Sequence, residues 1–413
     1  MPVDLKQIGP PKQYPARGPG LRVWLVVWVV CVLLVDGAVL LLWPKSTPAQ
    51  GAWFWLLIAG LPNVVFFALV AWNRAHYESQ HLHALYYNDH RERRRRELIA
   101  EGQRFLHVLG YTYQLPLKRG AFAQTVAEGE SVLKAQPLRD GSTIIRHLRL
   151  PDDAEHDTSD PRLAQVLQRS TLAREGKLHA HLLAPLVDMI EALVASGVSP
   201  AIRLVITDGE PVESALEQIH IVMGAFHLPA FERKAIPGSG GLMLIDEWLD
   251  AKEPRPLLVI ATALHDVPPE ESTEGGVAML LVPESLRLPQ GVAPCATFYR
   301  PVSRLADELG EGIALSMLWG KAAPPAIEHA WVTGFAEDQH TLIGEACRRT
   351  DLARLTTYAS RYNPDRVVGH AGVAAGWLAA AAASECGAAC PQLILNRASA
   401  MQAAIVHAHP VKT

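Results

Sequence analysis

Cysteine is scarce in this chain of 413 residues. The cysteines are odd in number and lack the paired short spacings of a zinc ribbon or a disulfide framework, so they are expected to be reduced thiols. Two of them are spaced to share one helical face and hold a metal, but no second pair of soft ligands lies near them in the sequence. We therefore expect neither a metal nor another cofactor. The five cysteines are Cys31, Cys295, Cys347, Cys386 and Cys390, of which the last two are that pair.

An excess of positive charge is also missing. The formal net charge is −4, and only 19% of the residues are charged. A nucleic-acid-binding domain normally presents a basic surface, so we expect no nucleic-acid partner. The hydrophobic share of 49% is sufficient for a large core, and the length exceeds that of one ordinary domain.

Charge is nearly absent from two stretches near the N-terminus. Residues 23–43 contain one charged side chain and residues 52–72 contain none. Each stretch has 21 residues, enough to cross a hydrocarbon layer of roughly 30 Å as a helix. The first stretch is too long for a cleaved signal peptide, has no small-residue cleavage site and is followed by the second. The sequence therefore predicts a two-helix transmembrane hairpin over residues 23–72.

Basic residues flank this hairpin on one side. They lie in the tail of residues 1–22 and in a run after the second stretch, whereas the loop between the stretches carries only Lys45. Because positive charge stays in the cytoplasm, both termini and the large C-terminal part are expected there. The basic residues of the tail are Lys6, Lys12, Arg17 and Arg22.

Residues 73–110 are predicted to form a basic, helical juxtamembrane connector. Its arginines have two interpretations: they bind anionic lipid head groups, or they are the stop-transfer charge that fixes the topology. The second is the simpler explanation of a run that directly follows an apolar stretch. The arginines are Arg93, Arg94, Arg95 and Arg96.

One carboxylate interrupts the first apolar stretch. Asp36 is costly inside a bilayer, so it is expected to face a partner helix or water. One interpretation is a proton or ion path, and the other is helix association through a pair with Asn63 on the second span. Two spans alone form no pore, which favours association. Pro62, beside Asn63, is expected to kink the second span.

From Tyr111 onward, short apolar runs alternate with helical patterns. Residues 202–209, 256–264 and 275–283 predict buried strands, and segments such as residues 181–200 place apolar side chains at helical spacing. Such alternation is typical of a layered α/β domain, which we expect over residues 111–413.

The order of these segments resembles the thiolase-like superfamily and, within it, the β-ketoacyl synthases. The likeness covers about residues 192–410 and is most specific in a Gly-His pair that opens an alanine-rich helix. The resemblance implies a thiolase-like layered α/β/α/β/α domain and a homodimer that pairs through a central strand. The segments that carry it are residues 192–207, 239–266, 272–286, 367–384 and 393–410.

A ketosynthase uses a cysteine at the start of a buried helix, where backbone N–H groups lower its pKa and form an oxyanion hole. The segment similar to that elbow, Ile236–Leu244, has no cysteine, and Ser239 is its only nucleophile. A serine there needs a base to activate it. Cys295 falls on the wrong side of the segment order and is expected to be a structural thiol.

The remaining catalytic positions of the family are only partly matched. His370 matches the second histidine of the family, and Asn396 matches the asparagine of the closing hairpin. The first histidine has only His340 as a candidate, which lacks the glycine that should follow it, and Arg366 is found where the family has a lysine. Because coupled catalytic groups fail together, the resemblance implies a fold kept and chemistry lost.

A second pair, His265 and Asp266, lies at the end of a predicted strand, where functional groups gather in α/β folds. The pair is either an acid–base couple or an exposed polar cap on a turn, and adjacent turn residues favour the cap.

Three functions follow from these features. The first is a non-enzymatic, membrane-anchored scaffold or adaptor with a catalytically dead ketosynthase-like domain. Its resemblance to proteins that accompany bacterial type VI secretion effectors implies a secreted effector or a secretion-machine component as protein partner. The alternative is a membrane-tethered acyl-transfer or hydrolytic enzyme that uses Ser239 and His370 in a remodelled pocket. The third is a membrane component, such as a transporter subunit or immunity protein, centred on Asp36.

Overall fold

The computed structural model describes residues 3–16, 18–44, 48, 50–117, 122–139, 141, 143–151, 160–169, 172–209 and 211–409. Arg17 and Lys45, which entered the prediction of orientation, lie outside these residues. The chain forms two compact units, Val3–Leu98 and a larger unit that begins at Ile99.

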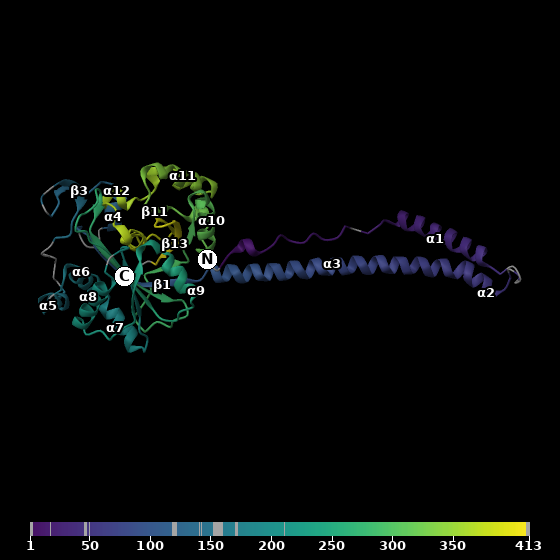
Figure 1. Ribbon diagram of the computed structural model, residues 1–413, viewed down its shortest axis with the longest axis horizontal. Helices are drawn as coiled ribbons and strands as arrows, with labels where there is room; N and C mark the ends of the chain where they lie inside the picture. The colour runs from purple at the N-terminus through teal and green to yellow at the C-terminus, as the bar shows by residue number, and fades with distance from the viewer. Residues whose placement is uncertain are drawn as a thin grey trace. The chain divides into compact units, whose positions relative to one another are not determined.

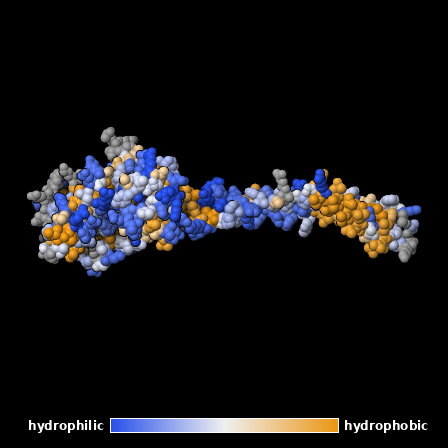
Figure 2. Space-filling model, turned by 90° about the horizontal axis from the view of Figure 1, so that it is seen from above, coloured by the Kyte–Doolittle hydropathy of each residue, from blue (hydrophilic) through white to orange (hydrophobic). Residues whose placement is uncertain are grey.

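The N-terminal unit contains helices long and apolar enough to cross a membrane. Helix α1 spans Leu21–Leu42, and a second helical run spans Ala52–Gly102. A third run of suitable length and composition, Arg174–Ala195, is half buried in the larger unit and belongs to its core. Figure 2 shows apolar residues gathered around α1 and the start of the second run, followed by a polar stretch. Apolar side chains that are exposed in this way can contact lipid, so the two helical runs are compatible with membrane anchoring.

The second run is a single continuous helical segment. It comprises α2 (Ala52–Trp55), a π-helical turn (Leu56–Gly60) and α3 (Leu61–Gly102). The irregularity that we expected as a kink at Pro62 takes the form of this π-helical turn, one of the usual ways in which a helix accommodates a break in its hydrogen bonding. The predicted second span and the predicted connector, as far as Gly102, are thus one helix.

Asn63 does not pair with Asp36, contrary to the prediction. The Trp28 indole N–H donates to Asn63 Oδ1 (3.0 Å), and the Asn63 amide donates to the Ala59 carbonyl (2.7 Å). Asp36 lies eight residues beyond Trp28, about 12 Å further along α1, so Asn63 cannot serve both. Asp36 Oδ1 has no hydrogen-bond partner among the described residues.

The N-terminal tail packs along α3 (Figure 1), which the sequence analysis did not anticipate. The Lys12 backbone N–H donates to Asn88 Oδ1 (2.8 Å), and the Asn88 amide donates to the Lys12 carbonyl (2.9 Å). Arg91 donates to the Gly9 carbonyl (2.6 Å). On the same helix, the four arginines 93–96 are exposed and each forms an ion pair within the helix, with Asp89, Glu92 or Glu97. Their charge is therefore partly offset by neighbouring carboxylates.

The larger unit is built on a ten-stranded sheet of order β11-β12-β13-β9-β1-β8-β6-β4-β5, with β10 paired to β13. A second sheet has the order β2-β3-β7. Strand β1 begins at Phe105, so the domain starts before Tyr111 and includes the end of the predicted connector. The strands are β1 Phe105–Gln114, β2 Lys134–Pro137, β3 Ile144–Leu148, β4 Ala201–Ile206, β5 Arg233–Pro237, β6 Leu257–Ala263, β7 Ser272–Thr273, β8 Gly275–Pro283, β9 Ala296–Tyr299, β10 Val302–Arg304, β11 His329–Thr333, β12 Gln392–Arg397 and β13 Met401–Ala408.

Helices cover both faces of the large sheet. One cluster of buried residues joins α9 and α13 to strands from both halves of the sheet. On the outer faces, α6, α7 and α8 pack against β4, β6 and β8, while α10 and α11 pack against β11, β12 and β13. The helices are α4 Phe122–Glu128, α5 Pro161–Arg169, α6 Arg174–Leu183, α7 Val187–Ala195, α8 Val212–Ala225, α9 Met243–Asp250, α10 Leu309–Trp319, α11 His340–Arg349, α12 Pro364–Val368 and α13 Ala375–Glu385.

The layer order is therefore α/β/α/β/α, as predicted. The sheet halves enclose α9 and α13, whose buried residues form one cluster with strands of both halves, and are joined by the pairing of β1 with β9. The sequence β4-α8-α9-β6-β8 in one half has its counterpart in β11-α11-α13-β12-β13 in the other, a duplication that leaves no obvious repeat in the residues. Six of the eleven residues of α13 are alanine, and its residues Ala375–Ser384 are all buried.

Candidate functional site

A cavity of about 250 Å³ lies where the carboxyl ends of several strands meet. Thr207 follows β4, His265 follows β6, and Asn396 and Arg397 end β12. Carboxyl ends of strands are where α/β folds collect functional groups. The pocket is lined by Thr207, Gly238, Ser239, Gly241, Ala263, His265, His370, Gly372, Val373, Gly376, Trp377, Asn396, Arg397 and Ala398.

Ser239 lies on the elbow between β5 and α9, within the 3-10 turn Gly238–Gly240. The turn packs closely against Val373. Only glycine fits at position 238, because a Cβ there would lie 2.1 Å from Val373 Cγ1. The Ser239 carbonyl accepts the backbone N–H (3.3 Å) and the hydroxyl (2.8 Å) of Ser399. The elbow is thus held by the β12–β13 turn, and the Ser239 side chain is exposed to the pocket.

The buried side-chain amide of Gln402 forms hydrogen bonds with backbone groups at the start of α9. Its Oε1 accepts the Leu242 N–H (2.9 Å) and the Asn396 amide (2.9 Å), and its Nε2 donates to the Gly240 carbonyl (2.8 Å). Gly241, at φ +54°, leaves room for this side chain, since a Cβ there would lie 2.5 Å from Gln402 Oε1. The Leu242 N–H is therefore already committed within the protein.

Replacing Gln402 with alanine is expected to lower the free energy of unfolding by about 1–3 kcal/mol, because buried groups of Leu242, Asn396 and Gly240 lose their partner. Q124A, which removes an exposed glutamine of α4 that only donates to Glu128, is the matched control and should lose less. Thermal denaturation of the full chain in detergent measures both. Equal loss in the two variants would contradict the role of the Gln402 amide.

His370 enters the pocket from the segment between α12 and α13. Its Nδ1 lies 3.5 Å from Asp365 Oδ1, and nearly half of its side chain is exposed. The same carboxylate accepts the Thr333 hydroxyl (2.6 Å) and the Gly334 N–H (2.6 Å). The hydrogen bond to Asp365 raises the pKa of His370, although burial opposes it. His370 is thus an oriented side chain of the pocket and neither caps α13 nor belongs to the core.

Replacing Asp365 with asparagine is expected to lower the pKa of His370, because the negatively charged carboxylate that accepts from His370 is replaced by a neutral amide. In the native protein the raised pKa favours the folded state at low pH, and this contribution is lost as pH rises through the pKa of the folded state. Histidine ring NMR of labelled protein follows the titration, and H370N identifies the signal. An unchanged titration in D365N would contradict the assignment.

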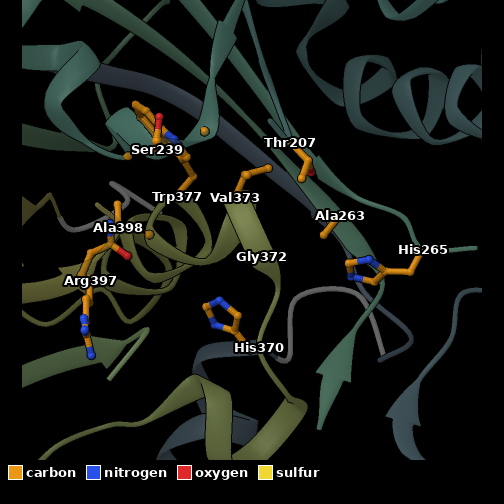
Figure 3. Close-up of a pocket in the computed structure, with 14 residues that line it drawn as sticks. Thr207, Ser239, Ala263, His265, His370, Gly372, Val373, Trp377, Arg397 and Ala398 are labelled. Atoms are coloured by element: carbon orange, nitrogen blue, oxygen red, sulfur yellow. The ribbon is translucent and has the colours of Figure 1, made fainter. Parts of the chain in front are cut away.

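The pocket brings together four residues that the sequence singled out, Ser239, His265, His370 and Asn396, whereas Asp266 is exposed and does not line it. Figure 3 shows Ser239 and His370 on different sides of the pocket, with Val373 between them in this view. Within the described residues, no hydrogen bond joins Ser239 to His370. A serine without a base in reach is a weak nucleophile.

Other sequence candidates lie elsewhere. His340 is buried at the start of α11 and does not line the pocket. The Arg366 guanidinium lies 5.7 Å from the Tyr358 ring centroid. The Cys295 thiol donates to the Val108 carbonyl (3.3 Å), and burial raises its pKa to about 11, as expected for a structural thiol.

Four residues that support the site were not among the sequence candidates: Thr333, Gly334, Asp365 and Gln402. Thr333 ends β11 and Gly334 follows it, and both donate to the Asp365 carboxylate that contacts His370. Asp365 precedes His370 by five residues and stands directly before Arg366. Gln402 was also missed. A search for polar residues flanking the Gly-His pair would have found Asp365.

Comparisons with solved structures identify the fold. A ketosynthase domain of the oxazolomycin system of Streptomyces albus JA3453 matches with a TM-score of 0.54 at 11% identity, covering 75% of each chain. The ketosynthase of module 6 of the bacillaene synthase of Bacillus subtilis 168 matches with a TM-score of 0.51 at 12% identity, covering 75% of this chain and 71% of that one. The larger unit has a ketosynthase-like, thiolase-like fold. No family model matches the chain, and no curated protein matches it.

At 11–12% identity these similarities establish the fold alone. In the ketosynthase-like domain, function must therefore be argued from the pocket. Its groups are a serine without a bonded base, a histidine bound to a carboxylate, and a glutamine that fills the helix start behind the elbow.

Proposed function

We propose that this protein is a non-enzymatic, membrane-anchored scaffold whose ketosynthase-like domain binds a protein partner. The observation that carries the proposal is that Ser239, the only nucleophile on the elbow, has no hydrogen bond to His370 among the described residues. A serine without a base to take its proton is a weak nucleophile for acyl transfer or hydrolysis.

The other groups in the pocket support the same proposal. The elbow has no cysteine, the glycine that follows β11 is preceded by Thr333, and Arg366, at the position of the family's lysine, lies near the Tyr358 ring and does not line the pocket. The Asp365 carboxylate beside His370 would oppose a negative charge that develops on a substrate oxygen. The domain thus keeps the fold but lacks the electrostatics of acyl condensation.

The N-terminal helices are proposed to anchor the protein as a two-span hairpin in a bacterial inner membrane, with both termini in the cytoplasm. The contact between Trp28 and Asn63 supports this arrangement, as does the packing of the N-terminal tail along α3. Asp36 is proposed to take part in helix association. Reporter fusions at both termini test the topology, and activity of a periplasm-dependent reporter at either end would overturn it.

The partner is proposed to be a secreted effector or a component of the type VI secretion machine, and the domain is proposed to form a homodimer. Both follow from the resemblance stated above. Cross-linking of the full chain in its native membrane, read by mass spectrometry, tests the partner, with residues 1–98 alone as the matched control. Secretion proteins enriched only with the full chain are expected. The same proteins on the control, or none, would overturn the proposal.

A second function, acyl transfer or hydrolysis at the membrane, is favoured by one observation. Asp365 orients His370 in the same pocket as Ser239, the arrangement of a base and its orienting carboxylate. Purified full chain in detergent, given an acyl thioester, tests this activity. We expect no turnover above that of S239A and H370A, and turnover abolished by both variants would establish the enzyme.

A further inference from the structure

The structure brings Glu328, His329 and Cys390 together at the edge of the large sheet. Strands β11 and β12 are parallel, and His329 pairs with Gln392. Glu328 and His329 therefore start one strand at the level where Cys390 leads into the other. One ligand atom from each of the three residues lies within 4.8 Å of the others. The sequence alone showed no further ligands near this cysteine, because they lie about sixty residues upstream.

We propose that these three residues bind a zinc ion, with water in the fourth position. Thiolate, imidazole and carboxylate are the protein ligands of zinc, and three of them plus water complete its tetrahedron. One thiolate, one carboxylate and one neutral imidazole balance the double charge of the ion. Tetrahedral bonds of about 2.0–2.3 Å place ligand atoms about 3.3–3.8 Å apart, so the three atoms, which lie within 4.8 Å of one another, must move closer when the ion binds.

Neighbouring residues orient two of the ligands. The His329 ring is stacked on Tyr362, with centroids 5.1 Å apart and planes 18° apart. Arg354 contacts Glu328 Oε1, which leaves the second carboxylate oxygen for the ion. Supports of this kind fix ligand orientation and raise affinity. His329 and Cys390 are half-buried and Glu328 is exposed, so an ion can enter from solvent.

The ion would connect β11, an edge strand, to the segment that leads into β12. Nothing in this inference depends on the scaffold function, because the site is separate from the pocket around His370 and shares no residue with it.

The test uses the full chain in detergent micelles, without an affinity tag, freed of metal by a chelator and titrated with Co²⁺ alone. We expect one equivalent to give a thiolate-to-cobalt charge-transfer band and the visible bands of a tetrahedral ion, both removed by Zn²⁺. C390S should lose the charge-transfer band, and H329N and E328Q should weaken binding at least about tenfold.

C386S and C295S are the matched controls, and both should keep the band. Absence of the band from the native chain would overturn the proposal, as would a band that survives C390S or disappears in C386S. Circular dichroism of each variant separates loss of the site from loss of the fold. Failure of this test would leave the proposed scaffold function unaffected, since that is tested by cross-linking.

Discussion

Replacing Arg300 with methionine is expected to lower the free energy of unfolding of the ketosynthase-like domain by about 3–5 kcal/mol. Arg300 is fully buried, and its Nη1 donates to Asp246 Oδ1 (2.5 Å) and to Asp250 Oδ1 (2.6 Å). Its removal leaves the buried Asp246 carboxylate without its countercharge. Burial already raises the pKa of Asp246, which shows how costly that charge is here. Thermal or urea denaturation of the full chain measures the loss.

The matched control is R349A, which breaks an exposed ion pair with Glu345 at 3.7 Å and should cost less than about 1 kcal/mol. The double variant R300M/D246N should be more stable than R300M, because it removes the carboxylate left unpaired. If R300M were no less stable than R349A, the buried pair would have no role in joining α9 to the β9–β10 turn.

Deleting residues 21–72 is expected to move nearly all of the protein from the membrane to the soluble fraction. The deleted segment holds both apolar helical stretches, and no other helix of the described chain combines such hydropathy with so little burial. Each stretch is long enough to span the hydrocarbon layer. Alkaline extraction of membranes followed by quantitative blotting measures the distribution.

Deletion of residues 3–16 is the control, because it removes the tail that packs on α3 and leaves both stretches in place. That variant should remain in the membrane fraction. Retention of the 21–72 deletion in alkali-washed membranes would show that another part of the chain is inserted and would contradict the proposed anchor.

Much of the fold was predictable because local patterns determine it. The uninterrupted apolar runs of β6 and β8 predicted buried strands. The run of small apolar residues in α13 predicted a buried helix. The apolar stretches were equally clear. The boundary of the domain was less so, since the polar pattern of α3 continues to Gly102 and β1 follows after only two residues.

The site was only partly predictable, because its decisive contacts join distant residues. Ser239, His370 and Asn396 were recognised by their segments and do share one pocket. Gln402, however, meets Leu242 across 160 residues, and no local pattern indicates which side chain will fill a helix start. The predicted pair of Asn63 with Asp36 was wrong for a similar reason. The register between the two helices decides which residue of α1 lies level with Asn63, and that residue is Trp28.

The central claim is that the ketosynthase-like domain binds a partner without using its pocket for catalysis. The most direct test compares the native chain with the S239A/H370A double variant, each at native expression, for the yield of cross-linked partner and for the cellular phenotype. Both residues reach the pocket, and the core does not depend on either side chain. We predict equal partner yield and an unchanged phenotype. Loss of the phenotype while partner yield stays intact would contradict the claim and assign the pocket a chemical role.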